Sequence, residues 1–113
     1  MENRRSQRLK CTALGQVRHQ SVTYRIRVEN VSRGGALLTS DDCLMLLPEE
    51  RCTLLIELPA EDARITANIE VVHAFFSMLG VKFLSFEQDG EQVLAEWLKR
   101  LSAQQESDAA TFA

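Results

Sequence analysis

This 113-residue sequence contains only three cysteines, two prolines and two histidines, and it has no long apolar run. The cysteines, Cys11, Cys43 and Cys52, fit neither a disulfide framework nor Cys-x-x-Cys zinc pairs, so we expect free, reduced thiols. The longest uncharged stretch rich in apolar residues, 71–81, is far shorter than the roughly 20 residues that span a bilayer. Residues 1–9 are charged and lack the apolar centre of a signal peptide. These absences predict a cytoplasmic protein with no membrane insertion.

Groups suited to catalysis or to metal binding are also scarce. The only imidazoles are His19 and His73, and no His-Glu-x-x-His, Gly-x-Ser-x-Gly or P-loop pattern occurs. The acidic pairs at 41–42 and 49–50 consist of neighbours in predicted loops, where their side chains need not converge. We therefore expect no enzyme activity, no catalytic residue, no metal site and no cofactor.

Charge is distributed unevenly along the chain. Residues 1–28 carry seven Arg or Lys and one acid, a net +6, whereas the remaining 85 residues carry six basic and fifteen acidic side chains, a net −9. A basic end on an acidic body favours an anionic partner at that end, although a solvated tail lying against the acidic surface would show the same pattern.

Hydrophobic periodicity predicts short strands followed by one helix. Apolar and polar residues alternate in 21–29, and further strand-like runs occupy 36–39, 52–58, 65–75 and 79–86. The connections are too short for crossover helices, which predicts an antiparallel meander or small barrel. The period then changes to that of an amphipathic helix over 87–103, with Trp97 as its main anchor on the sheet. The chain thus reads as a flexible arm (1–10), one β domain with a C-terminal helix (11–103) and a disordered tail (104–113).

Two short motifs stand out from this background. In the first, Arg4 and Arg8 are four positions apart, a spacing that places both guanidinium groups on one side of a helix or of an extended segment. Such a pair can grip a phosphate or the O6/N7 edge of guanine, although arginine-rich tails are common. In the second, Asn30-x-Ser32-x-x-Gly35 closes a strand. Its polar side chains should project together and its glycines should permit positive φ, which suits a ligand loop but also a plain polar turn.

Taken together and in this order, the two motifs resemble those of the PilZ domain family. The run from Asn30 to Leu38, Asn-Val-Ser-Arg-Gly-Gly-Ala-Leu-Leu, is very similar to the second motif of that family, and Gly80-Val81-Lys82-Phe83 is similar to its late strand. The resemblance implies a six-stranded antiparallel β-barrel with a C-terminal helix.

The resemblance also implies a function, namely a bacterial receptor for cyclic di-GMP in second-messenger signalling, of the kind that controls motility and biofilm formation. The implied ligand-binding residues are Arg4, Arg8, Asn30, Ser32 and Gly35, with Arg5, Arg33 and Gly34 as secondary candidates. Ligand binding would order the arm over the barrel and create a surface that an unidentified effector protein reads.

Two other classes remain open. One is a PilZ-like interaction module, such as those related to type IV pili, which contacts proteins without binding nucleotide. The other is a small barrel that binds single-stranded RNA or DNA, but such surfaces interleave basic and aromatic residues and the arm contains no aromatic. We therefore expect no nucleic-acid partner.

Overall fold

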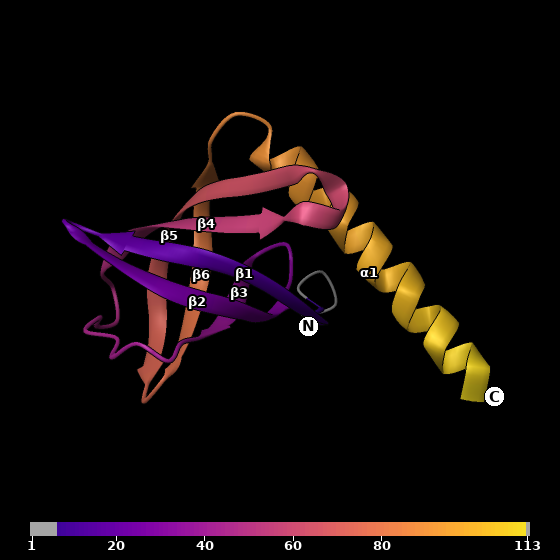
Figure 1. Cartoon of the computed structure of the whole chain (residues 1–113), viewed down its shortest axis with the longest axis horizontal. Coiled ribbons are helices and arrows are strands. Elements are labelled where there is room, and N and C mark those ends of the chain that lie inside the picture. The colour runs from indigo at the N-terminus through magenta and orange to yellow at the C-terminus, as the bar shows by residue number, and fades with distance from the viewer. Residues whose placement is uncertain (1–6, 113) are drawn as a thin grey trace.

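Six antiparallel strands form a closed barrel that is followed by one helix (Figure 1). The computed structural model describes residues 7–112, with side chains for residues 7–105. Around the barrel the strands follow the order β1-β2-β3-β6-β5-β4, and pairing of β4 with β1 closes it. The elements are β1 (Leu9–His19), β2 (Val22–Val31), β3 (Gly35–Thr39), β4 (Arg51–Leu58), the 3-10 turn η2 (Pro59–Glu61), β5 (Ala63–Phe75), β6 (Met78–Phe86) and α1 (Gly90–Phe112). The predicted barrel with a C-terminal helix is confirmed.

The first strand, β1, is the element that periodicity did not reveal. A register irregularity between Lys10 and Ala13 interrupts the alternation. Several inward positions hold small residues, among them Ala13 and Gly15, while Leu14 faces solvent. The apolar pattern is therefore weak, although the strand pairs with both β2 and β4. Because β1 begins at Leu9, the last two residues of the predicted arm belong to the barrel.

Alternating β-branched and leucine side chains fill the barrel interior. Along β4 every second residue is buried, and β5 shows the same period up to Val71. Leu46, in the connection between β3 and β4, is also buried in this core. The largest fully buried side chains are Leu38, Leu54, Ile56, Ile65, Ile69, Leu79, Val17, Val28, Val31 and Val71. Closure of the barrel therefore buries one face of each strand and leaves the other face to solvent.

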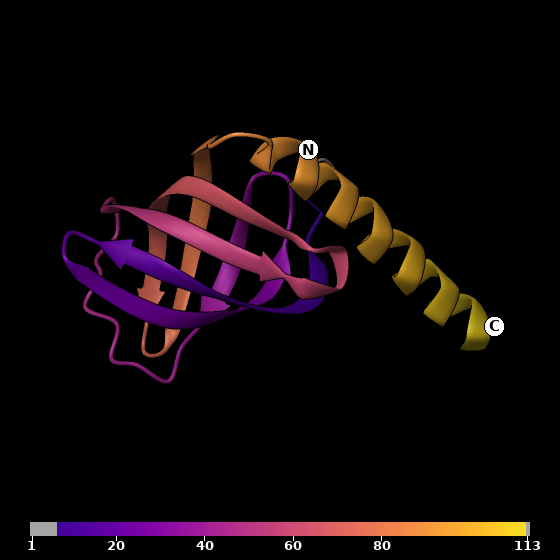
Figure 2. The same ribbon diagram turned by 45° about the horizontal axis from the view of Figure 1, so that its top comes forward.

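The helix α1 begins at Gly90, three residues later than predicted, and continues to Phe112. Trp97, only 5% exposed, and Leu94 pack into the core cluster, which confirms the predicted anchor. Residues 104–112 of the segment predicted as a disordered tail are thus helical, and the C-terminal half of α1 extends past the barrel (Figures 1 and 2). Among residues 7–112, no helix is both long enough and apolar enough to cross a membrane.

Antiparallel alternation gives the barrel two distinct ends. We call one the helix end: it carries the start of β1, the β2–β3 turn, η2 and the start of α1. The other, the hairpin end, carries the β1–β2 turn, the 40–50 connection and the β5–β6 turn. The two ends lie on opposite sides of the molecule (Figures 1 and 2).

Candidate functional site

The helix end joins the two sequence motifs through a hydrogen bond. Arg8 Nη1 donates to Asn30 Oδ1 at 2.9 Å, across 22 residues of chain. Arg8 lies just before β1 and Asn30 near the end of β2, and the register pairs Lys10 with Asn30. Arg8, the second arginine of the first motif, therefore contacts the second motif. Arg4 and Arg5 lie outside the described residues, and their roles stay predictions.

Ser32 organises the turn that follows β2. Its side chain is 3% exposed, and its Oγ accepts hydrogen bonds from the backbone N–H groups of Gly34 and Gly35, both at 3.2 Å. The backbone N–H of Ser32 donates in return to the Gly35 carbonyl oxygen at 2.8 Å. Since β2 ends at Val31, the period of a strand no longer applies to Ser32. The expectation that Asn30 and Ser32 project together is therefore wrong: Asn30 meets Arg8 at the surface, and Ser32 is buried in the turn.

The glycines of the second motif also differ from expectation. All five glycines lie within the described residues, and none has a positive φ. At Gly35, a Cβ atom would lie only 2.1 Å from the carbonyl oxygen of Val81. The position requires glycine because β6 approaches the backbone of β3 too closely for a side chain. Gly34 lies in the turn itself, and its carbonyl oxygen accepts from the Phe83 N–H at 2.8 Å.

An open groove of about 810 Å³ lies beside Asn30, between the β1–β2 surface and α1. Its volume is in the range of ligand sites. The residues around it are Lys10, Cys11, Thr12, Glu29, Asn30, Trp97, Leu101, Gln104 and Gln105. Gln105 Nε2 donates to the Lys10 carbonyl oxygen at 2.9 Å and thus joins the helix to the start of β1. Sequence reasoning missed both glutamines because it placed them in a tail, although their spacing from Leu101 continues the helical period.

The groove contains polar groups of both signs. Glu29 accepts a hydrogen bond from Thr39 Oγ1 at 2.7 Å and lies 3.6 Å from the Arg27 guanidinium. Burial, together with the negative charge of Glu29, raises the pKa of the Cys11 thiol to about 11, so this cysteine lines the groove as an uncharged thiol. The basic side chains that the structure places at this end, Arg8, Lys10 and Arg33, are the groups that could meet an anion.

Arg33 lies in the same turn and is exposed. Together with Phe86 and α1 residues including Leu94 and Leu98, it lines a small hollow of about 140 Å³. The structure thus brings Arg8, Asn30 and Arg33 to one end of the barrel.

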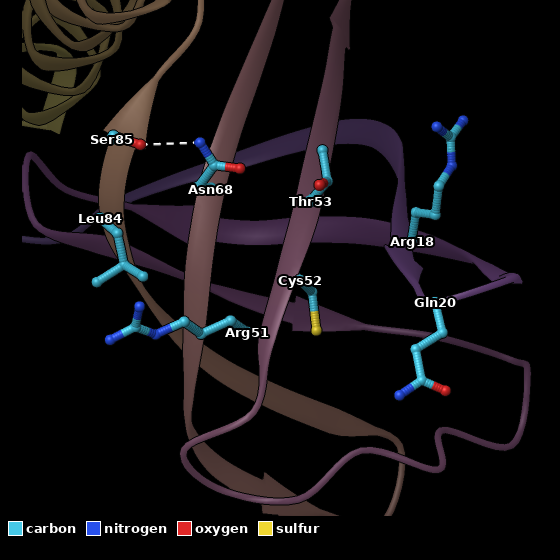
Figure 3. Close-up of a pocket in the computed structure, with 8 residues that line it drawn as sticks. All are labelled: Arg18, Gln20, Arg51, Cys52, Thr53, Asn68, Leu84 and Ser85. Atoms are coloured by element: carbon cyan, nitrogen blue, oxygen red, sulfur yellow. Dashed lines mark hydrogen bonds between the residues drawn. The ribbon is translucent and has the colours of Figure 1, made fainter.

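A second depression lies on the outer face of β1, β4, β5 and β6 (Figure 3). The register places Arg18, Thr53, Asn68 and Ser85 in one row across these strands, and Asn68 Nδ2 donates to Ser85 Oγ at 2.8 Å. Arg18 and Arg51 point away from each other at opposite sides of the depression (Figure 3). These guanidinium groups do not converge on one anion, so the helix end is the stronger candidate.

Comparison with known proteins decides the family. The model of the PilZ domain family matches residues 2–100. This chain belongs to the PilZ domain family. A search of curated proteins gave no match. Among solved structures, the Bacillus subtilis inhibitor of motility MotI/DgrA is similar, with a TM-score of 0.79 and 20% sequence identity. The similarity covers 92% of this chain and 53% of that chain, so the present sequence spans about half of its structural neighbour.

The PilZ assignment covers both sequence motifs and all six strands. At 20% identity the neighbour supports the fold alone. The barrel, the turn after β2 and the C-terminal helix are therefore the features of a PilZ domain that this chain shows directly.

Proposed function

We propose that this PilZ domain is a cyclic di-GMP receptor that acts as an adaptor toward a partner protein. The observation that carries the proposal is the hydrogen bond between Arg8 and Asn30, because it brings the two motifs into one site. Membership of the PilZ family and the adjoining groove support the same interpretation.

The chemistry of the ligand suits the groups at this end. Cyclic di-GMP carries two phosphates and two guanines, and an arginine can bind a phosphate, bind a guanine edge or stack on a base. The Asn30 carboxamide holds the exposed Arg8 guanidinium at the mouth of the site before any ligand arrives. Part of the conformational entropy that this long side chain would lose on binding is thus already lost in the free protein, which favours binding.

The residues of the second motif have two different roles, ligand binding and positioning. The N–H groups of Gly34 and Gly35 already donate to Ser32 Oγ, and that hydroxyl is buried. We therefore assign direct ligand contact to Arg8, Asn30 and Arg33, and a positioning role in place of direct contact to Ser32.

Signalling requires a surface that changes with the ligand. We propose that the nucleotide holds Arg4 and Arg8 together over the β2–β3 turn and so folds the N-terminal arm over the barrel. Ordering the backbone costs about 1–2 kcal/mol per residue, and charge-assisted hydrogen bonds of roughly 1.5–3 kcal/mol each offset it. The ordered segment would then form part of the surface that the partner recognises.

Isothermal titration calorimetry with cyclic di-GMP tests the proposal, with GTP and a short oligonucleotide as controls. Saturable heat with the cyclic dinucleotide alone is the expected result. Arg8→Ala should weaken affinity by roughly 10- to 150-fold, the equivalent of one charge-assisted hydrogen bond. Arg18→Ala is the matched control because Arg18 lies near the other end of β1. No heat from folded protein would contradict the receptor function and leave an interaction module that binds no nucleotide.

A further inference from the structure

The hairpin end of the barrel exposes an apolar surface that nucleotide binding does not explain. Phe75 and Phe76, at the tip of the β5–β6 hairpin, are 65% and 87% exposed, and their ring centroids are 4.4 Å apart. Val72 and Met78 of the same hairpin are exposed as well. We call these four residues the hairpin surface. Clustered exposed aromatic and methionine side chains typically mark a site of protein interaction.

The segment that crosses the hairpin end adds to this surface. The Ser40 N–H donates to the Ser77 carbonyl oxygen at 3.0 Å, and the Glu49 N–H donates to the Val71 carbonyl oxygen at 2.7 Å. Both ends of the 40–50 connection are therefore bonded to the hairpin. Between them, Met45 and Leu47 are exposed at the same end of the barrel.

One edge of the hairpin is open. On the β4 side, ladder pairing of β5 ends at Glu70, and the backbone bonds of Val71 to residues 49 and 50 are the last ones found there among residues 7–112. Strand β5 continues to Phe75 beyond this point. Natural proteins protect exposed edges with charges, proline or β-bulges, and residues 71–81 contain no Asp, Glu, Lys, Arg or proline. A register irregularity between Val71 and His73 lies at the start of the open stretch, and the pairing with β6 is regular from His73 to Phe75. An apolar edge without charge or proline is suited to pairing with a strand of another chain.

Charge indicates which chain would fit. Residues 40–50 contain four acids and no Lys or Arg. Three of the acids have a basic side chain nearby: Asp41 pairs with Arg27, Asp42 pairs with Arg25, and a carboxylate oxygen of Glu50 lies 3.6 Å from His19 Nε2. The fourth, Glu49, is exposed, and its backbone N–H is bonded to Val71 beside the open edge. A second copy of this chain would bring the same acidic segment with it. A segment with lysine or arginine beside apolar anchors complements this end.

We propose that the hairpin end docks an extended, apolar segment of a partner protein that is flanked by basic residues, and that this segment adds along β5 at residues 72–75. The site lies at the opposite end of the barrel from Arg8 and Asn30. Docking is therefore independent of the nucleotide site: the hairpin end holds the partner, and the helix end responds to the ligand. The inference does not rest on nucleotide binding.

Selection from a phage-displayed library of random 16-residue peptides tests this proposal, with the full chain as bait and Phe75→Ser/Phe76→Ser protein for counter-selection. Both rings are largely exposed, so the double variant should fold with an unchanged thermal midpoint. Binding of selected peptides can be followed with a fluorophore on Cys43, which is exposed, whereas Cys52 is buried and Cys11 partly so. We expect enriched peptides that combine apolar and basic residues and bind the double variant at least tenfold more weakly.

Three controls separate the alternatives. Arg8→Ala should leave peptide affinity unchanged, and so should Leu84→Ser, an exposed leucine of β6 about 20 Å along the strand from Met78. Peptides that are acidic, that bind the double variant equally well, or that fail to enrich would overturn the proposal. Self-association lost in the double variant would instead identify a second copy as the occupant. Phe76-dependent binding to phosphatidylglycerol vesicles would identify a membrane, and either result also overturns it.

Discussion

Replacing Gly35 by alanine tests whether this motif glycine serves the barrel or the ligand. The added Cβ would lie 2.1 Å from the Val81 carbonyl oxygen and 3.1 Å from the Lys82 Cα, both of which are backbone atoms of β6. Backbone cannot yield as a flexible side chain does, so β3 and β6 must separate by about 1 Å. Overpacking of this kind costs about 1–3 kcal/mol, occasionally more. Since β3 has only five residues over which to distribute the shift, we expect Gly35→Ala to lower the free energy of unfolding by about 3 kcal/mol.

Gly80→Ala is the matched control in the neighbouring strand. At Gly80 the nearest atoms belong to the His73 side chain at 3.5 Å, an ordinary contact, and φ is not positive. Alanine there should leave stability unchanged or raise it by up to about 1 kcal/mol, because it restricts the unfolded chain. Urea unfolding followed by the fluorescence of the single tryptophan, Trp97, measures both variants. Equal free energies of unfolding for the two alanine variants would refute the close-approach argument.

Further predictions concern the helix, the turn, an ion pair and the thiols. Trp97→Ala should lower the free energy of unfolding by about 3–5 kcal/mol, because the ring is buried against the barrel. Urea unfolding followed by circular dichroism measures this change, and a variant as stable as the parent would contradict the packing. Ser32→Ala should cost about 1–3 kcal/mol, measured in the same way, since the Gly34 and Gly35 N–H groups lose their acceptor. Hydrogen bonds from Arg100 lower the pKa of Glu61, so this stabilisation is present at neutral pH and disappears as the pH falls through the folded-state value. Glu61→Gln should therefore lower the urea midpoint at pH 7 and have no effect in strong acid; an equal deficit at both pH values would argue against the ion pair. Burial raises the pKa of Cys11 and of Cys52 to about 11, so maleimide at neutral pH should add one label, at Cys43, by mass spectrometry; rapid double labelling of the folded protein would show that a buried thiol is accessible.

Most of the barrel could be predicted because apolar and polar residues alternate strongly along its strands. Strands β2, β4 and β5 carry an apolar side chain at every second position over most of their length, and the connections between the predicted strands are too short for crossover helices. Strand β1 escaped because a register irregularity and small inward residues remove the alternation that periodicity detects. The C-terminal part of α1 was not predicted because its residues after Leu101 lack an apolar stripe.

The structure brings Arg8 and the second motif to one end of the barrel, whereas the geometry within the second motif differs from the prediction. The sequence could place Asn30, Ser32 and Gly35 at a strand end, yet it could not show that β2 stops between Asn30 and Ser32. That boundary sends one polar side chain to the surface and the other into the turn. The need for glycine at position 35 depends on Val81, a residue 46 positions away that only the closed barrel brings close.

The second motif therefore combines three separate physical requirements in six residues. Asn30 holds an arginine of the first motif, Ser32 closes the turn, and Gly35 allows β3 to pack against β6. Substitutions at the three positions should therefore have different effects. Replacing Asn30 should weaken ligand binding without changing stability, and replacing Ser32 should reduce both. Replacing Gly35 should chiefly reduce stability. Measuring affinity and unfolding free energy on the same variants separates these roles, because a purely ligand-binding motif would show loss of affinity at all three positions with stability unchanged.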